Sequence, residues 1–146
     1  MKLKLFFIIL AMTLTTPTHA NPAKPFLARC PNSPNCVSSQ ADSQDQVHYI
    51  APFKITGDPL KAWSALQTAL SNQARTVITD TTETSLHAKA TSLIFRFVDD
   101  VHIILEPEAR LIHIRSASRT GYSDFGVNRK RMVQLRQELQ QAGLIE

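Results

Sequence analysis

The chain has 146 residues, 43% of them hydrophobic, and carries sixteen lysines and arginines against twelve acidic residues, a formal net charge of +4. Lys2 and Lys4 belong to the N-terminal segment described next, and without these two cations the net charge falls to +2. So small an excess excludes a general nucleic-acid binder, which carries a far more basic surface. The length predicts a single domain.

The first twenty residues, MKLKLFFIILAMTLTTPTHA, have the order of a secretory signal peptide. Lys2 and Lys4 form its positive end, residues 5–14 its apolar centre, and residues 18–20 a small-residue cleavage site. The apolar run of about ten residues is too short to cross a bilayer, which takes about twenty. No other segment is apolar enough to span. We therefore expect a periplasmic protein, exported with cleavage near Ala20 and not membrane-spanning.

Residues 21–46 are rich in Pro, Asn, Ser, Asp and Gln and show neither helical nor alternating periodicity, which predicts an extended N-terminal arm. Within the arm, the stretch CPNSPNC places five residues between Cys30 and Cys36. In an oxidising compartment this pair predicts a structural disulfide. A redox-active pair or a metal site would more often show two-residue spacing. Closing so short a loop contributes about 2 kcal/mol of stability by chain entropy.

Residues 47–146 are expected to form one α+β domain. Residues 47–55 alternate as a first strand, and Pro52 places that strand at a sheet edge. A helix follows, with Asp58 as its N-cap and Pro59 as its first residue. Its apolar stripe is Leu60, Trp63, Leu66 or Gln67, and Leu70, with Ala62, Ala65 and Ala69 beside it. On this stripe Trp63 is interpreted as a core residue rather than as a stacking platform for a ligand.

Short β-like runs then occupy residues 75–79, 85–90, 92–105 and 109–118. The chain closes with a second helix whose apolar stripe is Met132, Leu135, Leu139 and Ala142 and whose end is marked by Gly143. This order predicts a twisted antiparallel sheet of four to five strands with two helices packed on one face.

The hairpin formed by residues 92–105 and 109–118 can be placed in register from its apolar residues. The first strand has them at odd positions (Phe95, Phe97, Val101, Ile103, Leu105) and the second at even positions (Ile112, Ile114). Paired residue numbers must therefore sum to an odd value, such as 215 or 217. Both registers place one polar set on the outer face: Arg96, Asp100, His102, His113, Arg115 and Arg119. The first register also sets Asp100 opposite Arg115 and His102 opposite His113.

Asp99 points inward on either register, because strand neighbours point to opposite faces. Asp99 and Asp100 therefore do not form a catalytic dyad. An inward carboxylate needs a partner, and the final helix offers Arg129, Arg131 or Arg136. We interpret Asp99 as a member of a structural ion pair before a functional one.

The stretch IRSASRTGYSDFGVNRKR, residues 114–131, gathers cations between a strand and the start of the last helix. A helix N-terminus flanked by arginines is a good receptor for an anion. The predicted anion site comprises Arg115, Ser116, Ser118, Arg119, Asn128 and Arg129, with Asp99, Asp100 and Asp124 as supporting acids. The competing interpretation is that these residues form ion pairs that only stabilise the fold.

Other chemistry finds less support in the sequence. Ser116 and Ser118 lack the glycine pattern of a nucleophile elbow. His102 and His113 alone are too few ligands for a zinc site, His87 is expected to be solvated, and His48 to be an edge residue rather than a base. The sequence thus predicts no catalytic residue, no metal and no cofactor.

Three blocks, CPNSPNCVSS, LIFRFVDDV and IRSASRTGYSDFGVNRKRMVQLR, resemble the signature blocks of the domain of unknown function 1499 family, which occurs in bacteria and plants. The resemblance covers nearly the whole mature chain, with the blocks in order. It implies the domain limits and brings no established activity, substrate or cofactor. It also implies an acidic or apolar residue where His102 stands, which argues against a metal or base role for His102.

Taken together, the sequence favours an exported, monomeric, non-catalytic binding or accessory domain whose polar site takes an acidic small molecule or an acidic segment of a partner protein. The first alternative is a purely structural Arg/Asp cluster in a protein that acts through protein–protein contacts. The second is a hydrolase-type enzyme.

Overall fold

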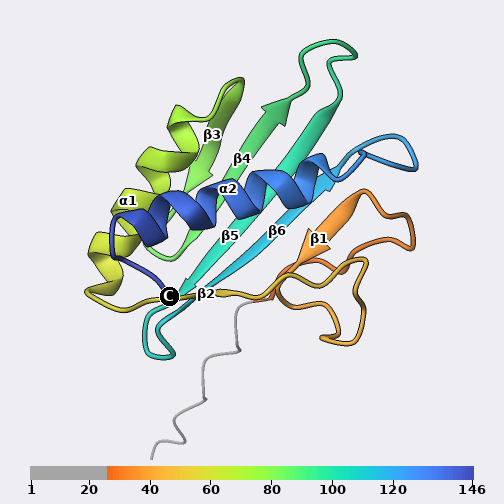
Figure 1. The fold of residues 1–146 in the computed structure, drawn as a ribbon. Coiled ribbons are helices and arrows are strands. Elements are labelled where there is room, and N and C mark those ends of the chain that lie inside the picture. The colour runs from red at the N-terminus through yellow and green to blue at the C-terminus, as the bar shows by residue number, and fades with distance from the viewer. Residues whose placement is uncertain (1–25) are drawn as a thin grey trace, which may run out of the picture.

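The computed structural model describes residues 26–146, so the expected signal peptide (residues 1–20) and the start of the arm lie outside the described residues. Figure 1 shows two layers, a twisted sheet and two helices that both cover the same face of it. The sheet has six strands, with order β1-β6-β5-β4-β3, and β2 also pairs with β6. All pairings are antiparallel. The expected α+β fold is confirmed.

The elements follow one another in the order β1 (Cys36–Ser38), β2 (Phe53–Lys54), α1 (Pro59–Asn72), β3 (Thr76–Thr81), β4 (Ser85–Thr91), β5 (Val98–Glu106), β6 (Leu111–Ser118) and α2 (Val127–Gln141). The sheet gains one strand over the expected number because the arm contributes β1, which pairs with β6. The core lies between the helices and the sheet, where buried leucines, isoleucines and Trp63 pack together.

The expected strand at residues 47–55 is shorter in the structure, where only Phe53 and Lys54 form a strand. Pro52 has no amide hydrogen to donate to a ladder. The carbonyls of this segment are instead bound by α2: the Arg129 guanidinium donates to Val47 O at 2.9 Å, and Arg136 donates to Pro52 O at 3.3 Å. Side chains of a helix thus satisfy backbone groups that a longer strand would have satisfied.

Helix α1 begins as predicted. The Asp58 side chain accepts a hydrogen bond from the Leu60 amide at 2.9 Å, and Pro59 is the first helical residue. Trp63 is buried in the core, which confirms its assignment. Leu60 is 69% exposed, so its place in the apolar stripe is wrong; it lies at the rim, where it borders a surface hollow with Trp63 and Thr82.

Helix α2 buries Met132, Leu135 and Leu139, as predicted. Ala142 is exposed instead of packed, because the helix has already ended there. Gly143 adopts a positive φ of 69° and donates to Gln140 O, while Leu144 donates to Leu139 O at 3.0 Å. This pattern is a Schellman closure, which favours glycine at the left-handed position.

The segment before β5 departs most from expectation. Strand β5 begins at Val98, and residues 92–97 form the loop between β4 and β5. Phe95 and Phe97, expected on the core face, are exposed, and Arg96 is a loop residue with φ of 52°. Strand β4 ends at Thr91, paired with Val98, so no strand lies opposite the preceding residues. The Ser92 amide closes the loop by donating to Phe97 O at 2.9 Å.

The hairpin of β5 and β6 adopts the second of the two possible registers. Asp99 lies opposite Ser118, and His102 lies opposite Arg115. The pairs of the first register, Asp100 with Arg115 and His102 with His113, are therefore not formed. Because both registers keep the same parity, the inward position of Asp99 is confirmed, and its side chain is buried.

Candidate functional site

The sheet divides the predicted anion site between its two faces. Ser116 and Ser118 share the helix-covered face with Asp99, whereas Arg115 and Asp100 point to the opposite, outer face. We call the first group, together with its partners from α2, the buried network: Asp99, Ser116, Ser118, Asn128 and Arg131. The outer-face cluster is His87, Asp100, His102, Arg115 and Arg119.

The buried network is centred on an ion pair between Asp99 and Arg131. Arg131 Nη2 donates to Asp99 Oδ2 at 2.7 Å, and the Ser118 hydroxyl donates to Asp99 Oδ1 at 2.6 Å. Arg131 Nη1 also donates to Ser116 Oγ and to Asn128 Oδ1, each at 2.9 Å. Every charge and hydroxyl in this set therefore has a partner inside the protein, as buried polar groups require.

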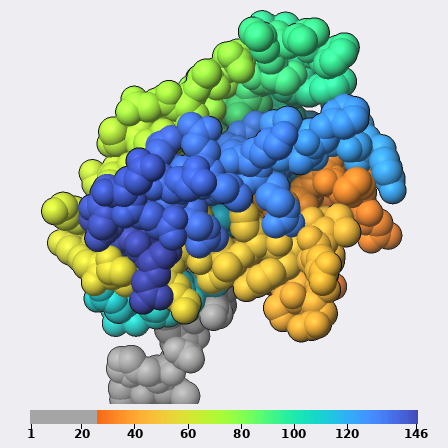
Figure 2. All heavy atoms as spheres, in the orientation of Figure 1, coloured from red at the N-terminus to blue at the C-terminus, as the bar shows by residue number. Residues whose placement is uncertain are grey.

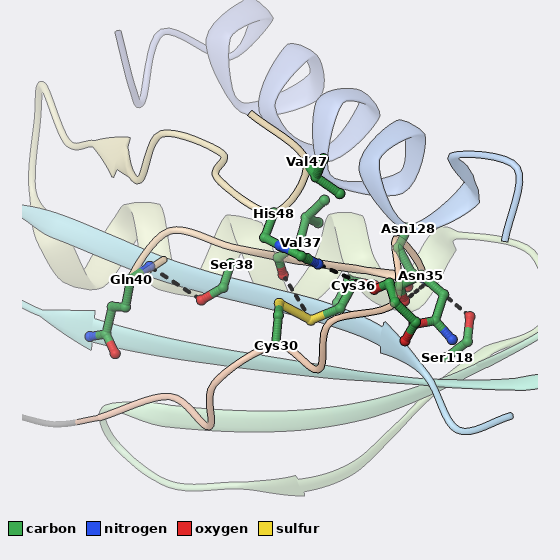
Figure 3. Close-up of a disulfide and its surroundings, with 12 residues drawn as sticks. Cys30, Asn35, Cys36, Val37, Ser38, Gln40, Val47, His48, Ser118 and Asn128 are labelled. Carbon is green, nitrogen blue, oxygen red and sulfur yellow. Dashed lines mark hydrogen bonds between the residues drawn. A yellow bond between two sulfur atoms is a disulfide. The ribbon is translucent and has the colours of Figure 1, made fainter. Parts of the chain in front are cut away.

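The buried network also fastens the arm and the start of α2. The Asn128 side-chain amide donates to Asn35 O at 3.2 Å, next to the disulfide that joins Cys30 to Cys36, and Ser118 N donates to the same carbonyl (Figure 3). The predicted disulfide is thus present. Residues far apart in the chain meet here, and the arm becomes part of the sheet.

The N-terminus of α2 has an acid of its own chain. The Asp124 carboxylate accepts from the Gly126 amide at 2.9 Å and from the Asn128 amide at 2.8 Å. These contacts place negative charge at the positive end of the helix dipole. Arg129, predicted in the site, lies apart from it and binds the Val47 carbonyl. An external anion at this helix end would have to displace Asp124.

Sequence reasoning placed Arg131 among possible partners of Asp99 but left it out of the site, and it missed Asn35 altogether. A signal for Arg131 exists: it stands three residues after Asn128 and four before Leu135, on the buried face of α2. Asn35 had no such signal, because the arm has no periodicity from which a direction could be predicted.

The outer-face cluster contains a second carboxylate with several donors. Arg119 donates to Asp100 through Nε at 2.7 Å and through Nη2 at 2.8 Å. His87 Nε2 lies 2.9 Å from Asp100 Oδ1, and its Nδ1 lies 3.2 Å from the Thr79 hydroxyl. The hydrogen bonds from Arg119, with His87 second, lower the pKa of Asp100 to about 2. His87 is therefore half-buried and bonded, not solvated as expected.

His102 and Arg115 complete this cluster. The His102 ring stacks at a tilt against His87, with 4.3 Å between ring centroids, and Arg115 lies opposite His102 on β6. Burial is the main cause that lowers the pKa of His102, and the nearby His87 and Arg115 lower it further. His102 is thus held neutral at pH 7, and a neutral ring can donate one hydrogen bond and accept another.

Arg115 differs from the other arginines of the cluster and the network. Its Nε is buried and has no hydrogen-bond partner among residues 26–146. Burial lowers the pKa of Arg115, which the charge of Asp100 opposes. A half-buried guanidinium without a carboxylate contact is costly, because desolvation is not offset by hydrogen bonds. Arg115 therefore has unused capacity to bind an anion.

A cavity of about 210 Å³ adjoins the cluster, between the arm and the outer face of the sheet. Its lining includes Phe26, Leu27 and Ala28 from the arm and His87 and His102 from the sheet. Two side chains of the cluster, His87 and His102, therefore border a space that a small polar group could enter.

Two further histidines, His48 and His113, form hydrogen bonds within the protein. His48 lies 2.6 Å from Asp45 through Nδ1 and 3.2 Å from Ser33 O through Nε2, beside a cavity of about 410 Å³ between residues 26–32 and residues 38–48. His113 links the Ser39 hydroxyl, at 3.2 Å, to Glu106, at 3.1 Å. Ser39, His113 and Glu106 are the residue types of a hydrolase triad. Ser39 and His113 are both buried, however, and the Ser39 hydroxyl already accepts a hydrogen bond from the Ile114 amide, so this hydroxyl is not presented to a substrate.

Within the described part of the chain, no group of three or more His, Cys, Asp or Glu side chains could hold a metal ion. Over the same residues, no helix is long and apolar enough to cross a membrane.

Fold and site together define a small α+β domain with an arm stapled to its sheet, a buried ion-pair network and a partly unsatisfied basic face. The chain belongs to the family described as protein of unknown function (DUF1499), whose profile matches residues 26–139. This match confirms the resemblance seen in the sequence blocks. No match was found among the curated proteins or among the solved structures.

Proposed function

We propose that this protein is an exported, periplasmic binding or accessory domain whose outer-face cluster binds an acidic group. The ligand is the carboxylate or phosphate of a small molecule, or an acidic segment of a partner protein. The N-terminal signal pattern supports export, and so does the Cys30–Cys36 disulfide, because such bonds persist in oxidising compartments.

The state of Arg115 is the observation that carries this proposal. Its guanidinium is partly desolvated and its Nε has no acceptor in the described residues. A carboxylate or phosphate oxygen that reaches Nε would supply the acceptor that Nε lacks, and a second oxygen on a terminal nitrogen would complete the bidentate geometry that arginine favours. Binding of an anion would offset the desolvation cost of the Arg115 guanidinium in the free protein.

The rest of the cluster suits the same ligand. Arg119 is 44% exposed at its side chain and held in place by Asp100, so it adds positive potential without closing the face. The neutral His102 ring offers a donor opposite Arg115. We assign the buried network, in contrast, a structural role, since Asp99 and Arg131 satisfy one another and both side chains are largely buried.

A thermal-shift screen tests the proposal. Wild type, Arg115→Gln and Lys61→Gln are compared in inorganic phosphate, dicarboxylates, phosphate monoesters and a short polyglutamate peptide. Lys61 is exposed on α1, so its variant makes the same charge change away from the cluster. The proposal predicts a dose-dependent rise in Tm for wild type and Lys61→Gln that Arg115→Gln lacks. Equal rises in all three proteins, or no rise with any anion, would contradict it.

A further inference from the structure

A separate surface of the molecule gathers exposed apolar side chains on two loops. One is the β4–β5 loop, residues 92–97, and the other is the β6–α2 loop, residues 119–126. These fourteen residues, of the 121 described, hold six of the twelve large apolar side chains that are exposed: Leu93, Ile94, Phe95, Phe97, Tyr122 and Phe125. Apolar residues scattered singly over a surface need no explanation, but six of them gathered on two loops form a patch that does.

The two loops leave the sheet at the same end. Strands β5 and β6 pair there through Asp99 and Ser118, and the Arg119 amide donates to Val98 O at 2.9 Å. Figure 1 shows both loops projecting beyond the ends of the strands, and the space-filling view in Figure 2 shows the β4–β5 loop standing out from the body. Ile94 is 79% exposed and Phe125 is 89% exposed, so the apolar groups are at the tips.

Three cations near these loops form no ion pair with a described residue. Arg96 stands between Phe95 and Phe97 in the first loop. Between the roots of the loops, Arg75 and Lys130 line a hollow of about 330 Å³, next to Arg131, which is paired with Asp99. Arg75 Nε donates to Thr91 O at 3.0 Å, which fixes this arginine beside the β4–β5 loop. The acid of the second loop, Asp124, is bound by the amides of α2.

We propose that this end of the molecule docks on an anionic lipid bilayer. The apolar tips would enter the interfacial region, and the hollow lined by Arg75 and Lys130 would receive phosphate headgroups. Protruding apolar tips flanked by uncompensated cations fit a soft, negatively charged surface, where buried apolar area and headgroup attraction both contribute. A protein partner would need a socket shaped to two separate tips.

Vesicle flotation tests the proposal, with vesicles of phosphatidylglycerol and phosphatidylethanolamine against vesicles of phosphatidylcholine alone. The full chain is expected to float with the anionic vesicles. Leu93→Ser/Phe95→Ser is expected to weaken binding by about tenfold or more, and Arg75→Gln/Lys130→Gln by about tenfold, in a salt-dependent way. Leu60→Ser and Lys61→Gln, exposed residues of α1 that lie outside both loops, serve as matched controls and should bind like wild type.

All variants carry the same residues 1–25, so a difference between them reports on the loops. Phe95→Trp gives a direct readout: the fluorescence of the introduced indole should be quenched by brominated lipid, whereas the buried Trp63 is shielded. No flotation with anionic vesicles, no quenching in the Phe95→Trp variant, or unchanged binding of the loop variants would overturn the proposal. It would also be overturned if free inorganic phosphate or glycerophosphate abolished vesicle binding at millimolar concentration, or if Leu93→Ser/Phe95→Ser instead dissolved an oligomer seen by light scattering.

Discussion

Arg119 holds the Asp100 carboxylate in a two-point contact, through Nε at 2.7 Å and Nη2 at 2.8 Å, on the face of the sheet that the helices leave uncovered. One strand position away, Asp99 makes an equally short contact with Arg131 on the covered face. Two neighbouring acids thus form ion pairs with two different arginines, one pair on the solvent-exposed face of the sheet and the other in the core.

The exposed pair predicts a pH-dependent contribution to stability. Asp100 has a folded pKa of about 2, below the ordinary value of 3.8, so its contribution is present above about pH 4 and is lost as pH falls toward 2. Because Arg119 is partly exposed, we expect Asp100→Asn to cost about 1 kcal/mol or less at pH 7. Urea unfolding at pH 7, 4 and 2.5 should show this difference shrinking on acidification; a difference that stays constant would be inconsistent with the ion pair as its source.

The buried pair should be coupled far more strongly. Arg131→Met leaves Asp99 buried without its cation, and removal of one partner from a buried pair costs about 3–5 kcal/mol. A double-mutant cycle with Asp99→Asn and Arg131→Met should therefore give a coupling energy of about 1–3 kcal/mol. The matched cycle replaces Arg131→Met with Arg129→Met, whose side chain binds a carbonyl instead. Similar coupling in both cycles would refute the assignment of Arg131 as the partner.

The disulfide should hold the arm against β6. Replacing Cys30 and Cys36 with alanine is expected to lower the free energy of unfolding by about 2 kcal/mol, from the entropy of the open loop in the unfolded chain. Hydrogen exchange should accelerate at the Ser39 amide, which donates to Ile114 O of β6 at 2.8 Å, more than in β4. Unchanged exchange at Ser39 would show that the arm is held against β6 without the disulfide.

The pKa of His102 should report on Arg115. Burial is the main cause of its lowered pKa, and the guanidinium of Arg115 lowers it further. Arg115→Gln should therefore raise the pKa of His102 part of the way back toward 6.5. Below about pH 6.5 the unfolded chain takes up this proton first, so His102 makes the folded state less stable as pH falls. NMR titration of the His102 ring in wild type and Arg115→Gln measures the shift; a fall or no change on removing Arg115 would contradict the arrangement.

The architecture was predictable because its elements carry strong local signals. The cap at Asp58, the helical apolar stripes and the alternation in β5 and β6 each fixed one element, and parity alone fixed the inward position of Asp99. The choice between the two hairpin registers, in which paired residue numbers sum to 215 or to 217, was not predictable, since both registers bury the same apolar residues. The loop at residues 92–97 was not predictable either, because Phe95 and Phe97 continue the apolar alternation of β5. These residues are in a loop because β4 ends at Thr91, opposite Val98, and leaves them no partner strand.

The faces on which the charged residues of the candidate site lie were predictable, but the partners of these residues were not. Strand parity separated Asp99 from Asp100, Arg115 and Arg119, yet the partner of Asp99 depends on which arginine of α2 reaches the sheet. That choice is made by tertiary packing: Arg131 shares the buried face of α2 with Asn128, whereas Arg129 points to the backbone near Val47. The arm residues that border the outer face carried no directional signal at all.

The most direct measurement of the central claim follows the Arg115 Nε–H resonance while inorganic phosphate, and then a dicarboxylate, is titrated into ¹⁵N-labelled protein. We expect a saturable shift of this resonance, accompanied by a rise in the pKa of His102 as negative charge arrives, while the Arg131 side chain stays unchanged in its contact with Asp99. A resonance of Arg115 that remains fixed throughout, under conditions where the anion does raise the Tm of the protein, would contradict it.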